Sequence, residues 1–171
     1  MYEKLLNKYA VNQLAYVVDD IEAVARAHAE LFGSGPFLHR GAASEEVTYR
    51  GEKTTVTMET AYGQLGDLQI ELIKSLTDGA DIYNETGRFG FHHVSIWVDD
   101  VEEALKDFAA VGCEPAMYML AGGGLPVFYV DCTELLGHFV EIHMPIPSFW
   151  GFVKHAHDEW DGTDPYREMV R

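Results

Sequence analysis

Two glutamates stand in the middle of short apolar runs, which is an unusual place for a carboxylate. Glu71 lies in the run QIELI, and Glu141 lies in the run FVEIH. Burying a carboxylate there is costly unless it is paired or binds a metal. Gln13 and His93 begin two further apolar runs and offer an amide oxygen and an imidazole nitrogen. An oxygen-rich set with one imidazole suits a single divalent ion, for which Zn, Ni, Co, Mn, Mg and Fe(II) all stay open.

The four residues occupy matching places in an internal repeat. Residues 13–24 read QLAYVVDDIEAV, and residues 93–104 read HVSIWVDDVEEA. Residues 65–73 (LGDLQIELI) and 136–144 (LGHFVEIHM) form a second pair in the same order. Each residue alone has an ordinary explanation, as an edge amide, a core histidine or a solvent-facing carboxylate. Their symmetry is what favours a metal site, with Glu71 and Glu141 also as candidate acid–base groups.

Strand alternation predicts which side chains share a face with these ligands, since successive residues of a strand point to opposite sides. His92 competes with His93 as the ligand, but the repeat alignment favours His93 and places His92 on the opposite face. The mostly apolar or aromatic set indicates a substrate with apolar surface and a carbonyl or vicinal oxygens. Trp97 and Phe139 could equally be core. The candidate pocket residues on the ligand face are Gln69, Ser95, Trp97, Phe139 and His143.

Each repeat also predicts the elements that position these residues. Asp20 and Asp100 are suited to cap helices that run to about Phe32 and Val111, where a glycine follows. The expected strands after the helices are 46–50, 54–61 and 69–73 in the first half, and 114–120, 127–131 and 139–143 in the second. The pattern predicts an α+β fold with two tandem βαβββ modules.

The module boundaries follow from these elements. We expect a single domain over 1–171, with modules at 11–75 and 91–145, a polar linker at 76–90 and a C-terminal extension at 146–171. The extension has helical spacing of its aromatic residues. We favour a helix packed on the outside of the sheet or against a dimer partner over a lid above the site.

Composition excludes several classes of function. The formal net charge is −16, which disfavours nucleic acids and anionic membranes. Two cysteines without metal-type spacing make no disulfide framework. Neither a membrane-length apolar run nor a signal peptide is seen, so we expect a cytoplasmic protein.

The segments QLAYVVDDIEA, GDLQIELI, GFHHVSIWVDD and LGHFVEIHMP resemble the vicinal-oxygen-chelate superfamily, closest to its glyoxalase I and methylmalonyl-CoA epimerase branch. The resemblance implies a cup-shaped sheet around the metal, with ligands at Gln13, Glu71, His93 and Glu141. Gln13 stands where a histidine is more usual. The ring-cleaving dioxygenases need two histidines and one carboxylate, which argues against that chemistry. Among the cations that hold glutathione in glyoxalases, Arg88 is the counterpart that this chain offers.

The predicted function is therefore a metal-dependent isomerase, epimerase or lyase acting on a small molecule. Glu141 would take a proton next to a metal-bound carbonyl, and Glu71 could return it. The alternative is a metal-free binding protein of the bleomycin-resistance type, and an oxygenase would need His92 or His143 as a further ligand. A homodimer is expected, because this fold often pairs through its sheet edges.

Overall fold

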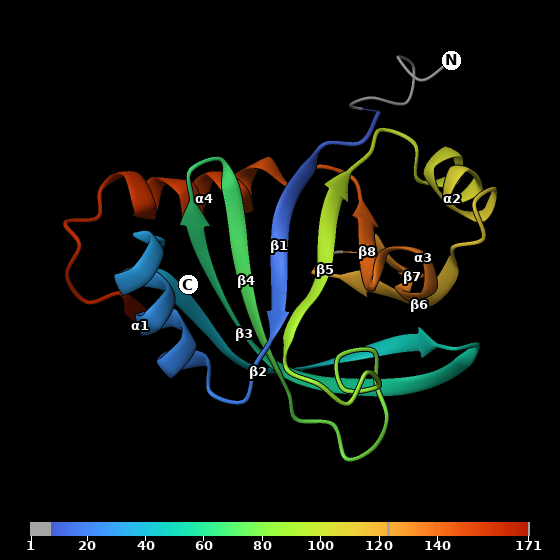
Figure 1. Ribbon diagram of the computed structural model, residues 1–171, viewed down its shortest axis with the longest axis horizontal. Helices are drawn as coiled ribbons and strands as arrows, with labels where there is room; N and C mark the ends of the chain where they lie inside the picture. The colour runs from blue at the N-terminus through green and yellow to red at the C-terminus, as the bar shows by residue number, and fades with distance from the viewer. Residues whose placement is uncertain (1–7, 123, 171) are drawn as a thin grey trace.

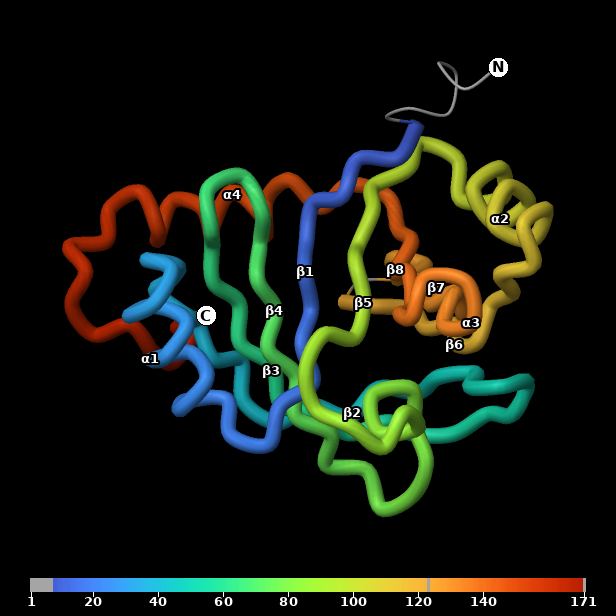
Figure 2. Tube along the Cα trace, in the orientation of Figure 1, coloured from blue at the N-terminus to red at the C-terminus, as the bar shows by residue number. Residues whose placement is uncertain are grey.

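The computed structural model describes residues 8–122 and 124–170 (Figures 1 and 2). Residues 1–7, where a signal peptide would begin, lie outside the described ranges. The first unit contains β1 (Val11–Val17), α1 (Ile21–Phe32), β2 (Phe37–Tyr49), β3 (Glu52–Leu65) and β4 (Leu68–Ser75). The second contains β5 (Gly90–Trp97), α2 (Val101–Ala109), β6 (Glu114–Ala121), β7 (Leu125–Cys132), α3 (Thr133–Leu136) and β8 (His138–His143). The chain then adds α4 (Pro147–Asp158) and β9 (Tyr166–Glu168).

The predicted pair of βαβββ units is confirmed, but β2 and β3 are longer than the sequence predicted. They form an antiparallel ladder whose register runs from Leu38 opposite Tyr62 to Tyr49 opposite Glu52. The stretch GAASEE in β2 carries small and polar residues on both faces, so it lacks the apolar alternation that marks a strand. Backbone pairing with β3 holds it extended all the same.

Aspartate caps start both main helices, as predicted. The side chain of Asp20 accepts a hydrogen bond from Ala23 N at 3.0 Å, and that of Asp100 accepts one from Glu103 N at 3.0 Å. Helix α1 ends before Gly33, which adopts the left-handed conformation with φ 69°. Helix α2 ends at Ala109, before the predicted Val111.

The strands form one curved sheet that closes on itself. Their order is β3-β4-β1-β5-β8-β7-β6-β2-β9, and β2 also pairs with β3. The two units meet where β1 runs antiparallel to β5 and where β2 pairs with β6. The strands that carry the four candidate ligands, β4, β1, β5 and β8, are therefore consecutive neighbours.

The two helices lie on the outer face of this sheet, one over each unit (Figure 1). Ile21 and Ala25 of α1 pack against Ile70 and Leu72 of β4. In the second unit, Ala104 of α2 packs in the cluster that contains Val140 and Ile142 of β8. The concave face is left for the site.

Helix α4 is placed differently from our expectation. It lies over the concave side: Phe149 packs edge-on against Tyr62 at 4.8 Å between ring centroids, and Trp150 packs against Trp97 at 5.1 Å. The favoured prediction of a helix on the outside of the sheet is therefore wrong, because its aromatic face finds apolar partners inside the cup. No helix within 8–122 or 124–170 has the length and apolar character to cross a membrane.

Candidate metal centre

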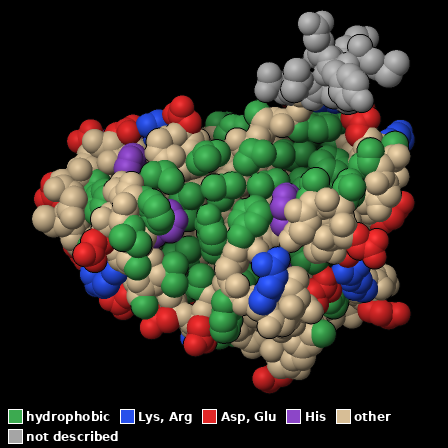
Figure 3. All heavy atoms as spheres, viewed as in Figure 1, with side chains coloured by type: hydrophobic (Ala, Val, Ile, Leu, Met, Phe, Trp, Pro, Cys, Tyr) green, Lys and Arg blue, Asp and Glu red, His purple; other side chains and the backbone are tan. Residues whose placement is uncertain are grey.

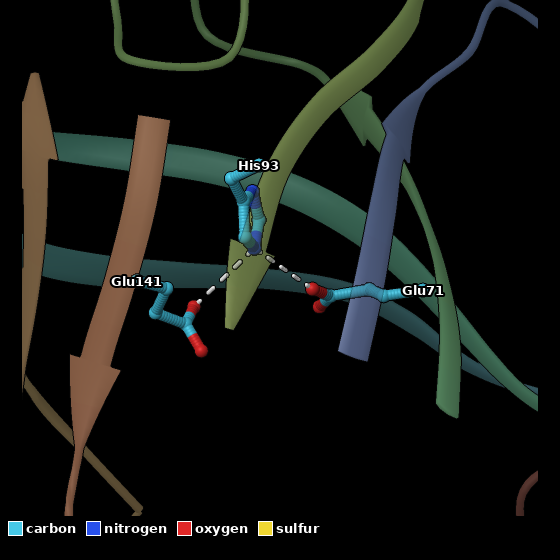
Figure 4. A group of neighbouring side chains, drawn as sticks. All are labelled: Glu71, His93 and Glu141. Carbon is cyan, nitrogen blue, oxygen red and sulfur yellow. Dashed lines mark ion pairs between the residues drawn. The ribbon is translucent and has the colours of Figure 1, made fainter. Parts of the chain in front are cut away.

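Glu71, His93 and Glu141 come together on the concave face of the sheet (Figure 4). His93 Nε2 lies 3.6 Å from Glu71 Oε2 and 3.6 Å from Glu141 Oε2. All three residues are buried, with His93 fully excluded from solvent. The two carboxylates approach the imidazole from opposite sides (Figure 4).

The strand register explains why these side chains converge. Glu71 and His93 both stand opposite Ala15 of β1, and Gln13 and Glu141 both stand opposite Ser95 of β5. The site thus consists of two rows, each with a small residue between two long polar ones. Ala15 and Ser95 leave the space that the longer side chains need to meet above the sheet.

Gln13 lies next to this trio and has a free oxygen. Its Nε2 donates a hydrogen bond to Gln69 Oε1 at 2.7 Å, while its Oε1 is buried without a partner in the part of the chain that the structure describes. Gln69 therefore orients the amide so that its acceptor atom is left for a ligand.

His92 fixes the chemical form of His93. Its Nε2 lies 2.7 Å from Ile82 O, and a carbonyl only accepts, so this nitrogen carries a hydrogen. Burial lowers the pKa of His92 to about 4, which leaves the ring neutral and its Nδ1 an acceptor. The Nδ1 atoms of His92 and His93 are 2.8 Å apart, so His93 donates from Nδ1. The lone pair of His93 then lies on Nε2, toward the carboxylates.

The expectation that His92 points to the opposite face is wrong. The pairing of β1 with β5 shifts register between Ala15–His93 and Tyr16–Phe91, so His92 is the extra residue of a β-bulge. The bulge turns its ring toward the inside, against Phe139 at 4.9 Å between centroids.

Each glutamate faces a tyrosine directly across the neighbouring strand. Tyr62 stands opposite Glu71, and Tyr129 stands opposite Glu141. Sequence reasoning missed both, although each tyrosine lies in the strand that precedes its glutamate's strand, and that shared position in the two units could have revealed them. Burial raises the pKa of Glu71 to about 8, helped by the charge of Glu141 and opposed by the Tyr62 hydroxyl and Arg40.

Gln13, Glu71 and Glu141 line a cavity of about 430 Å³, and His93 lies buried behind the two carboxylates. The six predicted pocket residues divide into four groups. His143 lines the cavity, with its Nε2 3.1 Å from Ser95 Oγ and 3.4 Å from Glu141 Oε1. Gln69, Ser95 and Trp97 are not among the lining residues but contact Gln13, His143 and Trp150, which are. Phe139 packs against His92. Arg88 lines a separate cavity and donates to Gly137 O at 3.1 Å.

The donor set fits a divalent metal on its own chemistry. Within the described ranges, His93 Nε2 and Gln13 Oε1 are buried polar atoms without hydrogen-bond partners. A buried atom of this kind is costly unless something binds it. Two carboxylates, one imidazole and one amide oxygen are ligands that such an ion accepts.

Comparison with known proteins agrees with this architecture. The sequence profile of the glyoxalase/bleomycin resistance protein/dioxygenase superfamily matches residues 12–129, more than half of the chain. The chain belongs to this superfamily. Its profile match spans all of the first unit after Val11 and most of the second, including three of the four candidate ligands. No curated protein matches the chain.

Solved structures show the same superfamily fold. A hypothetical protein from Bacillus halodurans has a TM-score of 0.58 at 17% identity, covering 81% of this chain and 96% of that one. Methylmalonyl-CoA epimerase from Mycobacterium tuberculosis has a TM-score of 0.56 at 11% identity, covering 82% and 91%. A Streptomyces coelicolor methylmalonyl-CoA epimerase variant in complex with 2-nitronate-propionyl-CoA has a TM-score of 0.54 at 12% identity, covering 80% and 96%. At these identities the likeness concerns the fold alone.

Proposed function

We propose that the protein is a divalent-metal-dependent isomerase or epimerase. If the substrate carries a leaving group next to the deprotonated carbon, the same chemistry would make it a lyase. One observation carries this proposal: two buried carboxylates that line a largely apolar cavity flank an imidazole nitrogen that has no hydrogen-bond partner among the described residues. Gln13, Glu71, His93 and Glu141 would hold the ion. When bound, the ion would polarise a substrate carbonyl and stabilise the oxyanion formed on deprotonation.

The chain's own residues supply the proton transfers. Glu141 would take the proton from the carbon next to the carbonyl onto its carboxylate, breaking the C–H bond. Glu71, on the other side of His93, would return a proton to the opposite face of that carbon. Two flanking groups allow inversion of a stereocentre or a 1,2-proton shift. The aromatic side chains of α4 would keep water away from the carbanionic species.

The first test is the metal content of the protein itself. The protein is purified without chelator or affinity histidines, and divalent ions are measured by elemental analysis. We expect about one ion per chain in the wild type and a fall of at least about tenfold in metal affinity in Glu141→Gln. Glu114→Gln is the matched control, because Glu114 is exposed on β6. A wild type without metal even after reloading would favour a metal-free binding protein.

A further inference from the structure

A single cation stands at the mouth of the cavity. Among the described residues that line it, Arg40 of β2 is the only lysine or arginine. Its side chain is 33% exposed, whereas the side chains of Glu71 and Glu141 at the floor are 9% and 10% exposed. The guanidinium lies 3.5 Å from Glu45 Oε1, beyond the range of a good hydrogen bond. Arg40 is thus weakly engaged and faces the cavity.

The cavity has two chemically different ends. The floor carries the candidate metal ligands, and the mouth carries Arg40 beside Glu45. The rest of the lining is largely apolar and includes Met58, Met119, Leu125, Val127 and Phe149. Arg40, Glu71 and Glu141 all line this one cavity of about 430 Å³. One molecule of modest length can therefore contact both ends.

We infer that the substrate is a monocarboxylic acid whose carboxylate binds Arg40, with metal-chelating oxygens at its other end and an apolar segment between them. This inference rests on the proposed function and names its substrate class. A guanidinium binds a carboxylate through two parallel hydrogen bonds, which fixes its orientation as well as its position. Arg40 would thereby place the reacting carbon between Glu141 and Glu71.

The charge of the site argues against a coenzyme A thioester. Such a ligand brings several phosphate charges and needs several cations at the mouth. Here one arginine is accompanied by Glu45, and the whole chain carries a formal net charge of −16. A single carboxylate matches the single cation, whereas a polyphosphate would be repelled.

Two matched probes test the inference. Both 3,4-dihydroxyphenylacetate and its amide present the same vicinal oxygens to the metal, and only the first carries a carboxylate. Their binding to metal-loaded protein is measured by calorimetry under anaerobic conditions. We expect the wild type to bind the acid about tenfold or more tightly than the amide. Arg40→Met should bring that ratio close to one while leaving the metal content and the binding of the amide unchanged.

The controls separate the possible failures. Arg88→Met, which removes a cation of the other cavity, should keep the wild-type ratio. Glu45→Gln should raise the affinity for the acid, because it removes the competing carboxylate. Equal binding of acid and amide by the wild type overturns the role of Arg40 and leaves the metal proposal standing. Failure of both probes to bind loaded protein overturns the chelation on which the proposal depends. Tight, Arg40-independent binding of coenzyme A would also overturn the inference.

Discussion

The position of one hydrogen atom decides whether His93 can act as a ligand. His93 donates from Nδ1 to His92, and His92 donates to Ile82 O, so the chain of hydrogen bonds ends on the backbone. A carbonyl oxygen can only accept a hydrogen bond. The direction of donation, from His93 to His92 and from His92 to Ile82 O, is therefore fixed. In many metal sites a residue behind the histidine sets its tautomer in this way. Here that residue is its own neighbour in sequence.

Removing His92 should therefore weaken metal binding although His92 would not touch the ion. In His92→Phe, His93 Nδ1 loses its acceptor, and the ring can carry its hydrogen on Nε2 instead. We expect a loss of about 10- to 100-fold in metal affinity, measured by calorimetry with Zn²⁺. His92→Gln keeps a side-chain acceptor and should recover part of the loss. Equal affinities in wild type and His92→Phe would rule out the role assigned to His92.

At the scale of the elements, the internal repeat predicted more of the arrangement of the site residues than the local hydrophobic pattern did. The repeated strand–helix entry placed Gln13 and His93 at matching positions, and the structure puts them on neighbouring strands β1 and β5. The bulge at His92 was not predicted, because the run from Phe91 to Val94 has no strict apolar alternation against which an extra residue would stand out. The placement of α4 could not be predicted either. Its aromatic face fits several apolar surfaces, and only the assembled cup shows which one is open.

Helix α4 closes the cavity through Trp150, and its removal should widen the site. Trp150 packs against Trp97 and, at 5.7 Å between centroids, against His143. Trp150→Ala is expected to reduce the affinity for the catechol probes about tenfold, because apolar contact area is lost. Phe152→Ala is the control on the same helix, where the side chain is 45% exposed. Binding and thermal stability are measured together, and a loss of stability without a loss of affinity would contradict the assignment of α4 to the site.

At the scale of the whole molecule, the buried Glu71 lowers the stability of the metal-free fold at high pH. The pKa of Glu71 is about 8 in the folded protein against an ordinary value of 4.5. The folded state therefore binds more protons than the unfolded state between these values, and stability falls as the pH rises through that window. Such a cost is tolerable where a bound cation reverses it.

Glu71→Gln should remove most of this dependence. In the presence of chelator, we expect the melting temperature of the variant to exceed that of the wild type by roughly 5 °C or more at pH 8. At pH 4.5 the two melting temperatures should be nearly equal. Differential scanning calorimetry across the pH range gives both curves. Parallel curves would show that Glu71 ionises freely in the folded protein, contrary to its buried position.

The homodimer remains a proposal for the molecule as a whole. Because the sheet closes on itself, it leaves few unpaired strand edges to which a second chain could add a strand. The apolar side chains that gather over the strands between α1 and α2 offer a different surface (Figure 3). Sedimentation equilibrium decides between one chain and two.

The line where β1 meets β5 also runs through the middle of the metal centre. Gln13 and Glu71 belong to one unit, and His93 and Glu141 belong to the other. A cation held by all four would link the two units. Separating the units would then require two coordinate bonds to break together. Slow amide hydrogen exchange along β1 and β5 would then report occupancy of the centre. The same atoms that prepare a substrate for chemistry would hold the two units of the chain together.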